Sequence, residues 1–307
     1  MIQPNEMTHR HQMKPPGKKH AYEKFIPSLF LLAASISVIT TIGIIMTLIG
    51  DAFEFFKAVP LKDIFSTELA PLSANPKFGF IPLITGTAVT SLIAMLVATP
   101  IGLMAAMYMS EFASDRTRRM LKPIVELLAG IPTIVYGFFA YSFVTPLLTK
   151  FIPGLEAKNA LSPGIVMGIM IIPLVTSLSE DAMNAVPNVM REGALALGST
   201  KLESALHVVF PAALSGIIAS IVLGISRAVG ETMIVAIASG SSKNFTLDIT
   251  QSMQTMTGYI VEFTSGDAGS GTVGYYSLYA VGLILFVFTL IMNMVAQHIS
   301  KKYREVY

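Results

Sequence analysis

The sequence predicts an all-α membrane protein with six transmembrane helices. Hydrophobic residues make up 53% of the 307 residues, charged residues make up 13%, and the mean hydropathy is +0.65. Soluble domains usually carry about 25% charged residues, so this composition excludes an ordinary soluble fold. Uncharged stretches long enough to cross a bilayer, about 20 residues, recur along the chain.

Six segments meet this length requirement. Four of them contain no Asp, Glu, Lys or Arg, the third contains only Glu126, and the fifth is interrupted by Arg227 and Glu231. Prolines inside three of the segments predict kinks, which a helix bundle tolerates when its neighbours satisfy the freed backbone groups. The predicted spans are residues 26–50, 81–109, 123–149, 161–179, 208–240 and 275–299.

The connecting segments differ in positive charge. With the N-terminus in the cytoplasm, the cytoplasmic segments hold 14 of the 21 Lys and Arg residues and the outer segments hold 6. Positive loops favour the cytoplasmic side, so we expect a multi-pass protein of the cell (inner) membrane with both termini in the cytoplasm. The expected organisation is a tail over 1–24, a first helix and outer loop over 25–80, a transmembrane domain over 81–300, and a tail over 301–307.

The cytoplasmic loop between the fourth and fifth spans carries a spaced motif. Glu192-Gly193-Ala194 opens it, Gly198 follows, and Val208-Val209-Phe210-Pro211 comes after nine intervening residues. A glycine can end a helix in the left-handed conformation, and an acidic residue near a helix start favours the helix dipole. We therefore expect a short amphipathic helix over about 187–203 that presents a compact knob to a partner. The alternative is an ordinary inter-span helix with a glycine cap.

Two opposite charges lie inside the fifth span. Arg227 lies 16 residues after Pro211, about 24 Å along a helix, and Glu231 lies one turn further on, on the same helix face. An Arg in the membrane costs roughly 2.5–3.5 kcal/mol, so we expect either a structural ion pair or a pair that faces a polar path. On such a path the guanidinium would offer bidentate hydrogen bonds to an oxyanion.

These motifs resemble segments of ABC importer permeases. The loop motif is similar to their E-A-A-x3-G-x9-I-x-L-P signature, with Gly193, Val208 and Phe210 as departures. Ser226–Met233 resembles the R-A-x-G-E-T-M segment of the PstC family, one of two families of membrane subunit in phosphate ABC importers, whereas the sister family PstA more typically has G-E-T-A-P there. Glu126–Gly137 resembles the E-L-L-A-G-I-P-S-I-V-Y-G segment of phosphate permeases. The resemblance runs from about residue 81 to the C-terminus.

The resemblance implies the type I ABC importer permease (MetI-like) fold, with a core of five helices and an N-terminal helix that wraps a partner. It implies a pore shared with a PstA-like permease, two copies of a cytoplasmic ATPase subunit, and an extracytoplasmic phosphate-binding protein. Inorganic phosphate would pass Arg227, Glu231, Thr232 and Ser226. The ATPase would bind at Glu192, Gly193, Ala194 and Gly198. Glu126 is expected either at the membrane interface or at a gate or subunit contact.

Other functions are disfavoured by what the sequence lacks. It contains no nucleotide-binding G-x4-G-K-S/T loop, so we expect ATP hydrolysis on a separate polypeptide and no enzymatic activity here. It has no cysteine and no cluster of acids and histidines inside the spans, so no metal or cofactor is expected, and its small net charge gives no reason to expect nucleic acid. A permease for another oxyanion, such as sulfate or molybdate, and the sister permease PstA remain alternatives.

Overall fold

The computed structural model of the chain describes residues 19–267, 269 and 271–302, and it divides into two compact units, Met1–Thr47 and Leu48–Tyr307. The described residues are mostly helical, with one antiparallel hairpin formed by β1 (Leu69–Ala70) and β2 (Lys77–Phe78). Much of the two expected tails, residues 1–18 and 303–307, lies outside the described residues.

Four continuous helices in the described part of the chain are long and apolar enough to cross a membrane. They correspond to the first, second, fourth and sixth predicted spans; the first, fourth and sixth extend beyond the predicted limits, and the second continues into a π-helical segment over Tyr108–Phe112. Up to six spans result if each of two bent helix pairs counts as one. The four helices are α1 (Lys19–Ala58), α3 (Ile81–Met107), α7 (Leu161–Asn184) and α14 (Val273–Lys302).

The third predicted span is not one straight helix. It consists of α4 (Asp115–Ala129) followed by α5 (Thr133–Phe139), a π-helical turn and α6 (Thr145–Thr149), and the two halves meet at an angle of 83°. The bend falls at Pro132, which has no N–H to donate and disfavours helical geometry in the residue before it. The predicted kink at this proline is thus a complete break, whereas α3 and α7 continue past their internal prolines.

The fifth predicted span is interrupted twice. A helical segment over 201–212, which contains α9 (Lys201–Ser204) and α10 (Phe210–Ala212), meets α11 (Leu214–Val229) at 71°. The chain then leaves helical geometry at residues 230–232 before α12 (Met233–Ala238) begins. The prediction of one helix over 208–240 was therefore wrong, because hydropathy records the apolar character of a segment and not its direction.

The predicted outer loop over 241–274 is partly a buried helix. Within it, α13 (Met256–Glu262) packs against α14 and α3, and Tyr259 is completely buried. The segment is rich in Ser, Thr and Gly, which hides this helix from an analysis based on hydropathy. The loop prediction holds only for the residues around α13.

The core of the second unit is centred on the packing of α3 against α7. Gly164 and Gly168 allow this close approach, because a Cβ atom on either glycine would lie 2.7 Å from a side-chain carbon of α3. The spacing Gly164-x3-Gly168 is of the kind that permits close approach of membrane helices.

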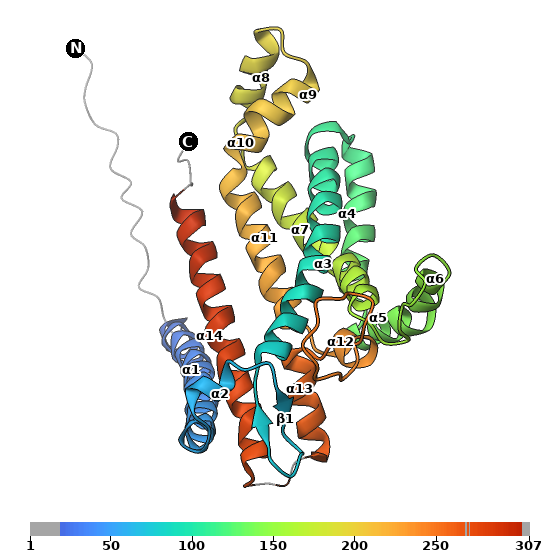
Figure 1. Cartoon of the computed structure of the whole chain (residues 1–307). Helices are drawn as coiled ribbons and strands as arrows, with labels where there is room; N and C mark the ends of the chain where they lie inside the picture. Colours follow the sequence, from blue (N-terminus) through green and yellow to red (C-terminus); the bar gives the residue numbers. More distant parts are fainter. Residues whose placement is uncertain (1–18, 268, 270, 303–307) are drawn as a thin grey trace, which may run out of the picture. The chain divides into compact units, whose positions relative to one another are not determined.

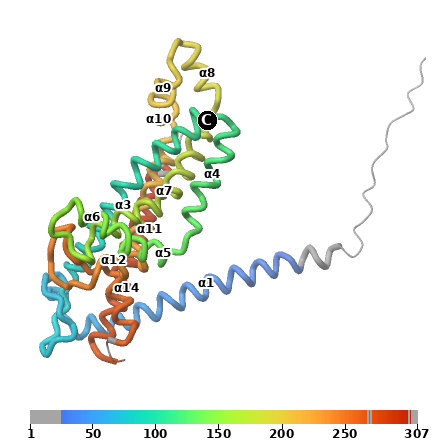
Figure 2. Tube along the Cα trace, turned by 90° about the vertical axis from the view of Figure 1, so that its right-hand side faces the viewer, coloured from blue at the N-terminus to red at the C-terminus, as the bar shows by residue number. Residues whose placement is uncertain are grey.

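Different segments of the chain form the two ends of the second unit. In both views (Figures 1 and 2), α8 (Asn188–Ala196) and α9 lie at one end, and the segment with α2 (Leu61–Ile64), β1 and β2 lies at the other. The connection between α3 and α4 is at the same end as α8 (Figure 1). Two of the segments with a cytoplasmic expectation, 110–122 and 180–207, therefore lie at one end of this unit.

Candidate functional site

The loop motif forms a short helix that ends as its glycine predicts. Gly198 has a φ of +93°, the left-handed conformation. Its N–H donates to the Leu195 carbonyl (3.0 Å), and the Ser199 N–H donates to the Ala194 carbonyl (3.2 Å). This pair of bonds is a Schellman motif, which satisfies carbonyls that the helix end would otherwise leave unpaired. The predicted helix stop at Gly198 is confirmed, but the single helix expected over about 187–203 is wrong, because α9 (Lys201–Ser204) begins separately after that stop.

The helix α8 presents most of its surface to solvent. None of its residues is buried, and the side chain of Leu197 just after it is 90% exposed. Gly193 is exposed, and a Cβ added to it would meet no atom within 4 Å. Glu192 is also exposed, but it is the fifth residue of the helix and lies outside the first turn. The expectation that Glu192 acts on the helix dipole is therefore wrong.

A helix N-cap at Thr200 follows directly after α8 and Gly198. The Thr200 hydroxyl accepts the Glu203 N–H (3.2 Å), and the Glu203 carboxylate accepts the Thr200 N–H (2.7 Å). This reciprocal capping box starts α9 directly after the glycine stop. The sequence 198–203 thus builds a turn between two helices whose geometry local hydrogen bonds determine.

Glu231 lies in the break between α11 and α12. Its side chain is buried, and Oε1 accepts the N–H groups of Met233 (3.0 Å) and Ile234 (3.3 Å). Its own carbonyl accepts the hydroxyl of Thr257 on α13 (2.7 Å). The carboxylate therefore caps the start of α12, and the carbonyl ties the break to α13.

Arg227 lies in the last turn of α11 and is exposed. Within the described part of the chain its guanidinium has no hydrogen-bond or ion-pair partner. Because α11 ends at Val229, Arg227 and Glu231 do not share a helix face, and of the two arrangements expected for them the ion pair is not formed in the described residues. The bend after α10 also means that the distance of about 24 Å from Pro211 does not run along one straight helix. Measured from Leu214 at the start of α11, Arg227 lies about 20 Å along the helix.

The other two predicted path residues make local contacts. The Ser226 hydroxyl donates to Oδ1 of Asn293 on α14 (3.3 Å), and the Thr232 hydroxyl donates to the Gly230 carbonyl (3.2 Å). Both side chains are half-buried. The four residues therefore surround one break in the chain, but only Arg227 presents a free charged group there.

Glu126 is exposed on α4 and lines a cavity of about 640 Å³. The other lining residues are Asp115, Arg118, Arg119, Lys122 and Pro123. None of the residues of α4 is buried, although the helix is strongly amphipathic. An exposed position is compatible with both expectations for Glu126, the membrane interface and a gate or subunit contact.

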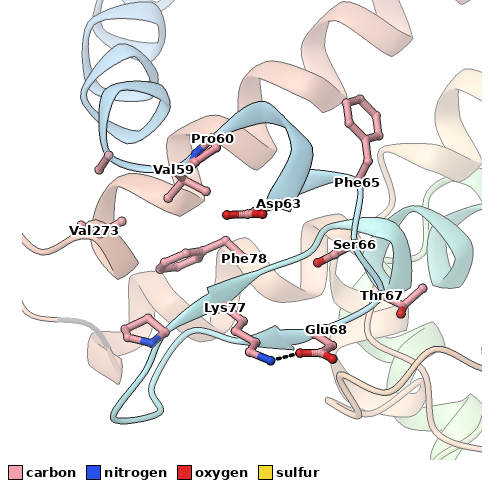
Figure 3. Close-up of a pocket in the computed structure, with 12 residues that line it drawn as sticks. Val59, Pro60, Asp63, Phe65, Ser66, Thr67, Glu68, Lys77, Phe78 and Val273 are labelled. Atoms are coloured by element: carbon pink, nitrogen blue, oxygen red, sulfur yellow. Dashed lines mark hydrogen bonds and ion pairs between the residues drawn. The ribbon is translucent and has the colours of Figure 1, made fainter.

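The segment between α1 and α3 forms a cavity that its sequence does not predict. It has a volume of about 790 Å³, and residues 58–78 with Val273 line it. Figure 3 shows Val59, Asp63 and Phe78 around this cavity and the ion pair between Lys77 and Glu68 at its edge. Apolar and charged groups alternate along this segment without a recognisable motif, so its sequence gave no signal.

The loop that contains Asp248 is held by hydrogen bonds between its own polar groups. Asp248 accepts the hydroxyl (2.7 Å) and the N–H (3.0 Å) of Thr250, and these bonds hold the pKa of its carboxyl below the ordinary value. The loops over 150–160 and 238–251 are joined by backbone hydrogen bonds, among them Ala160 N–H to the Gln251 carbonyl (3.2 Å).

No group of three or more His, Asp or Glu side chains in the described residues has a geometry that would hold a metal ion. His9 and His11, which the polar tail carries, lie outside those residues.

Comparisons with known proteins agree with these features. Residues 98–305 match the family model described as "Binding-protein-dependent transport system inner membrane component". The phosphate transport system permease protein PstC of Mesorhizobium japonicum is 32% identical over 287 residues, which cover 87% of this chain and 86% of that protein.

Two solved structures share the fold. A chain of a bacterial alginate ABC transporter, crystallised with an alginate pentasaccharide-bound periplasmic protein, has a TM-score of 0.63 at 16% identity and covers 93% of this chain. A chain of the MetNI methionine ABC transporter in an inward-facing form has a TM-score of 0.54 at 15% identity and covers 74% of this chain and 95% of its own length. The fold is that of MetI-like ABC transporter permeases, as the sequence predicts.

Proposed function

Because this chain belongs to the family of binding-protein-dependent transport system inner membrane components, we propose that it is the PstC-type permease subunit of an ATP-driven phosphate importer. In this proposal the multi-pass chain forms half of a translocation pore. The PstC relative, whose name gives phosphate transport as its role, supports the choice of substrate.

The observation that carries the proposal is the free guanidinium of Arg227. It is exposed about 20 Å along α11 and has no partner among the described residues. An unpaired Arg is costly in lipid, so its partner must come from water, a substrate anion or another subunit. A guanidinium matches a phosphate oxyanion with two parallel N–H···O bonds. Glu231 supports this site by fixing the break at which the guanidinium is presented.

The remaining parts of the proposal concern orientation and partners. The end with α8 faces the cytoplasm together with both terminal tails, and the end with β1 and β2 faces outward. Two ATPase subunits supply ATP hydrolysis, and one of them binds the knob formed by α8 and Gly198. A PstA-like permease completes the pore, and a phosphate-binding protein docks outside. Glu126 on exposed α4 lies at a gate or at the contact between the two permeases.

Substitution of Arg227 tests the pore site. We expect Arg227→Gln to lower phosphate uptake by at least about tenfold in the reconstituted importer, because hydrogen bonds to a charged group contribute roughly 1.5–3 kcal/mol each. Radiolabelled phosphate uptake at fixed ATP measures this. Arg227→Lys keeps the charge but loses the planar fork, so it should retain part of the uptake.

Ser215→Ala is the control, since Ser215 lies in the first turn of α11, about 18 Å along the helix from Arg227. It should leave uptake within about twofold of the wild type, because the substitution removes one small polar group away from the site. Normal uptake by Arg227→Gln in an intact complex would show that the guanidinium does not take part in phosphate passage.

A further inference from the structure

A buried carboxylate joins α7 to α4 at the end of the unit that carries α8. Glu180 on α7 has a side chain with no exposed surface, and two basic groups of α4 approach it. Nε of Arg118 lies 2.5 Å from Oε1, and Nζ of Lys122 lies 3.1 Å from Oε2. The Lys122 contact is an ion pair without hydrogen-bond alignment. A buried charge is tolerated only when it is paired, so Glu180 ties the two helices together.

A second ion pair joins α8 to the end of α3. The guanidinium of Arg191 on α8 lies against Glu111, with Nη2 3.0 Å and Nε 3.2 Å from Oε1. Nη2 also donates to the Met183 carbonyl (2.6 Å), and Nη1 donates to the Val186 carbonyl. One side chain of α8 thus serves both the turn that ends α3 and the C-terminal end of α7. Both members of the pair are largely buried, with 17% and 11% of their side-chain surface exposed.

Two small polar side chains lie between these ion pairs. The Ser110 hydroxyl is 2.9 Å from Oε1 of Glu111 and 3.2 Å from Oδ1 of Asn184. It has one proton, so it can donate to only one of these oxygens at a time. The Asn184 amide in turn donates to Oε1 of Glu180 (3.4 Å). Polar contacts therefore run from Arg191 to α4, and at any moment the Ser110 hydroxyl is hydrogen-bonded to either the Glu111 side or the Asn184 side of the series.

The two helices at the ends of this series contain no fully buried residue. In α8, the half-buried Met190 packs against an apolar cluster of the core. Charged contacts add to this packing and hold both helices against α3 and α7. Directional hydrogen bonds and ion pairs resist displacement in specific directions, unlike a non-directional apolar contact.

We propose that Glu111 and Arg191 are positioning residues that transmit movement of α8 to α4 through Ser110, Asn184 and Glu180. The proposal rests on the proposed function, in which an ATPase moves α8. A shift of α8 pulls on the guanidinium of Arg191, and the series of contacts carries the shift to the helix that precedes the 83° bend. This gives the ATPase a route to the bent pair α4–α5. It is separate from the chain connection through α9, which leads to α11.

The test uses the complete importer in vesicles and measures phosphate uptake and ATP hydrolysis together. Glu111→Gln keeps the size of the side chain but removes its charge, and Arg191→Lys keeps a charge that cannot serve Glu111 and both carbonyls at once. We expect each variant to raise the ATP hydrolysed per phosphate transported by about 2- to 30-fold, with the ATPase subunits still bound. Glu180→Gln, at the other end of the series, should do the same.

The double variant Glu111→Gln, Arg191→Lys should be no worse than the more severe single variant, because the two residues act through one contact. Arg116→Gln is the control, since Arg116 is an exposed arginine of α4 with no partner among the described residues; its ratio should equal that of the wild type. Unchanged ratios in both single variants, or independent additive effects, would overturn the proposal.

Loss of ATPase binding in Arg191→Lys would also overturn it, because the pair would then serve docking and not transmission. The wild-type complex separates this result from a failure of the proposed function. If wild-type chain binds no ATPase or transports no phosphate, the proposed function is wrong whatever the variants do.

Discussion

Two glycines of the loop motif have opposite conformational roles. Gly193 lies inside α8 with open space around it, whereas Gly198 ends the helix in the left-handed conformation. The sequence was sufficient to predict the second role, because a glycine followed by a new polar cap is a typical helix stop. It was not sufficient for Glu231, whose helical spacing from Arg227 indicated a shared face. That inference assumes a continuous helix, and the carboxylate itself caps the helix after the break.

We expect Gly193→Ala to stabilise α8 and Gly198→Ala to destabilise it. Alanine at the first position removes the helix penalty of glycine, about 0.8–1 kcal/mol, and meets no neighbouring atom. Alanine at the second position must adopt a φ of +93°, which costs roughly 1–2 kcal/mol. Hydrogen–deuterium exchange of residues 188–199 measures both effects, and the two variants should shift protection in opposite directions. Equal shifts would contradict these roles.

At the scale of elements, the continuous helices were predictable and the breaks were not. Long uncharged stretches specify α1, α3, α7 and α14, because the bilayer requires about 20 apolar residues in each. The break at residues 230–232 combines a local cap by Glu231 with a hydrogen bond from Thr257 on α13, and α13 is buried within a segment rich in Ser, Thr and Gly. The bond from Thr257 and the burial of α13 are tertiary contacts that no local pattern records.

The contact between α3 and α7 should be sensitive to one methyl group. A Cβ at Gly168 would lie 2.7 Å from Cβ of Val97 and 2.8 Å from the Ala94 carbonyl oxygen, which is backbone and cannot rotate away. We expect Gly168→Ala to lower the free energy of unfolding by about 1–3 kcal/mol. Thermal unfolding of the detergent-purified protein measures this.

Gly50→Ala is the control for this prediction, because Gly50 is also inside an apolar helix but has no atom within 4 Å of an added Cβ. It should leave the melting temperature unchanged or slightly raised, since alanine favours helix more than glycine does. Equal melting temperatures for the two variants would mean that α3 and α7 are not held at this distance.

At the scale of the whole molecule, the distribution of positive charge predicts the direction of insertion. The α3–α4 connection belongs to the segments that together hold 14 Lys and Arg residues, and the hairpin of β1 and β2 belongs to those that together hold 6. We therefore expect Arg116 in the cytoplasm and Asn75 outside. Both residues are exposed.

The absence of cysteine from the sequence makes this orientation directly measurable. We expect Asn75→Cys to react with a membrane-impermeant maleimide in intact cells, or in spheroplasts where an outer membrane is present. Arg116→Cys should react only after the membrane is permeabilised, and the unsubstituted chain should not react in either condition. Because every even number of spans leaves both termini on one side, these two internal positions are more informative than the chain ends. Labelling of Arg116→Cys before permeabilisation would reverse the orientation, and with it the assignment of α8 to the ATPase side.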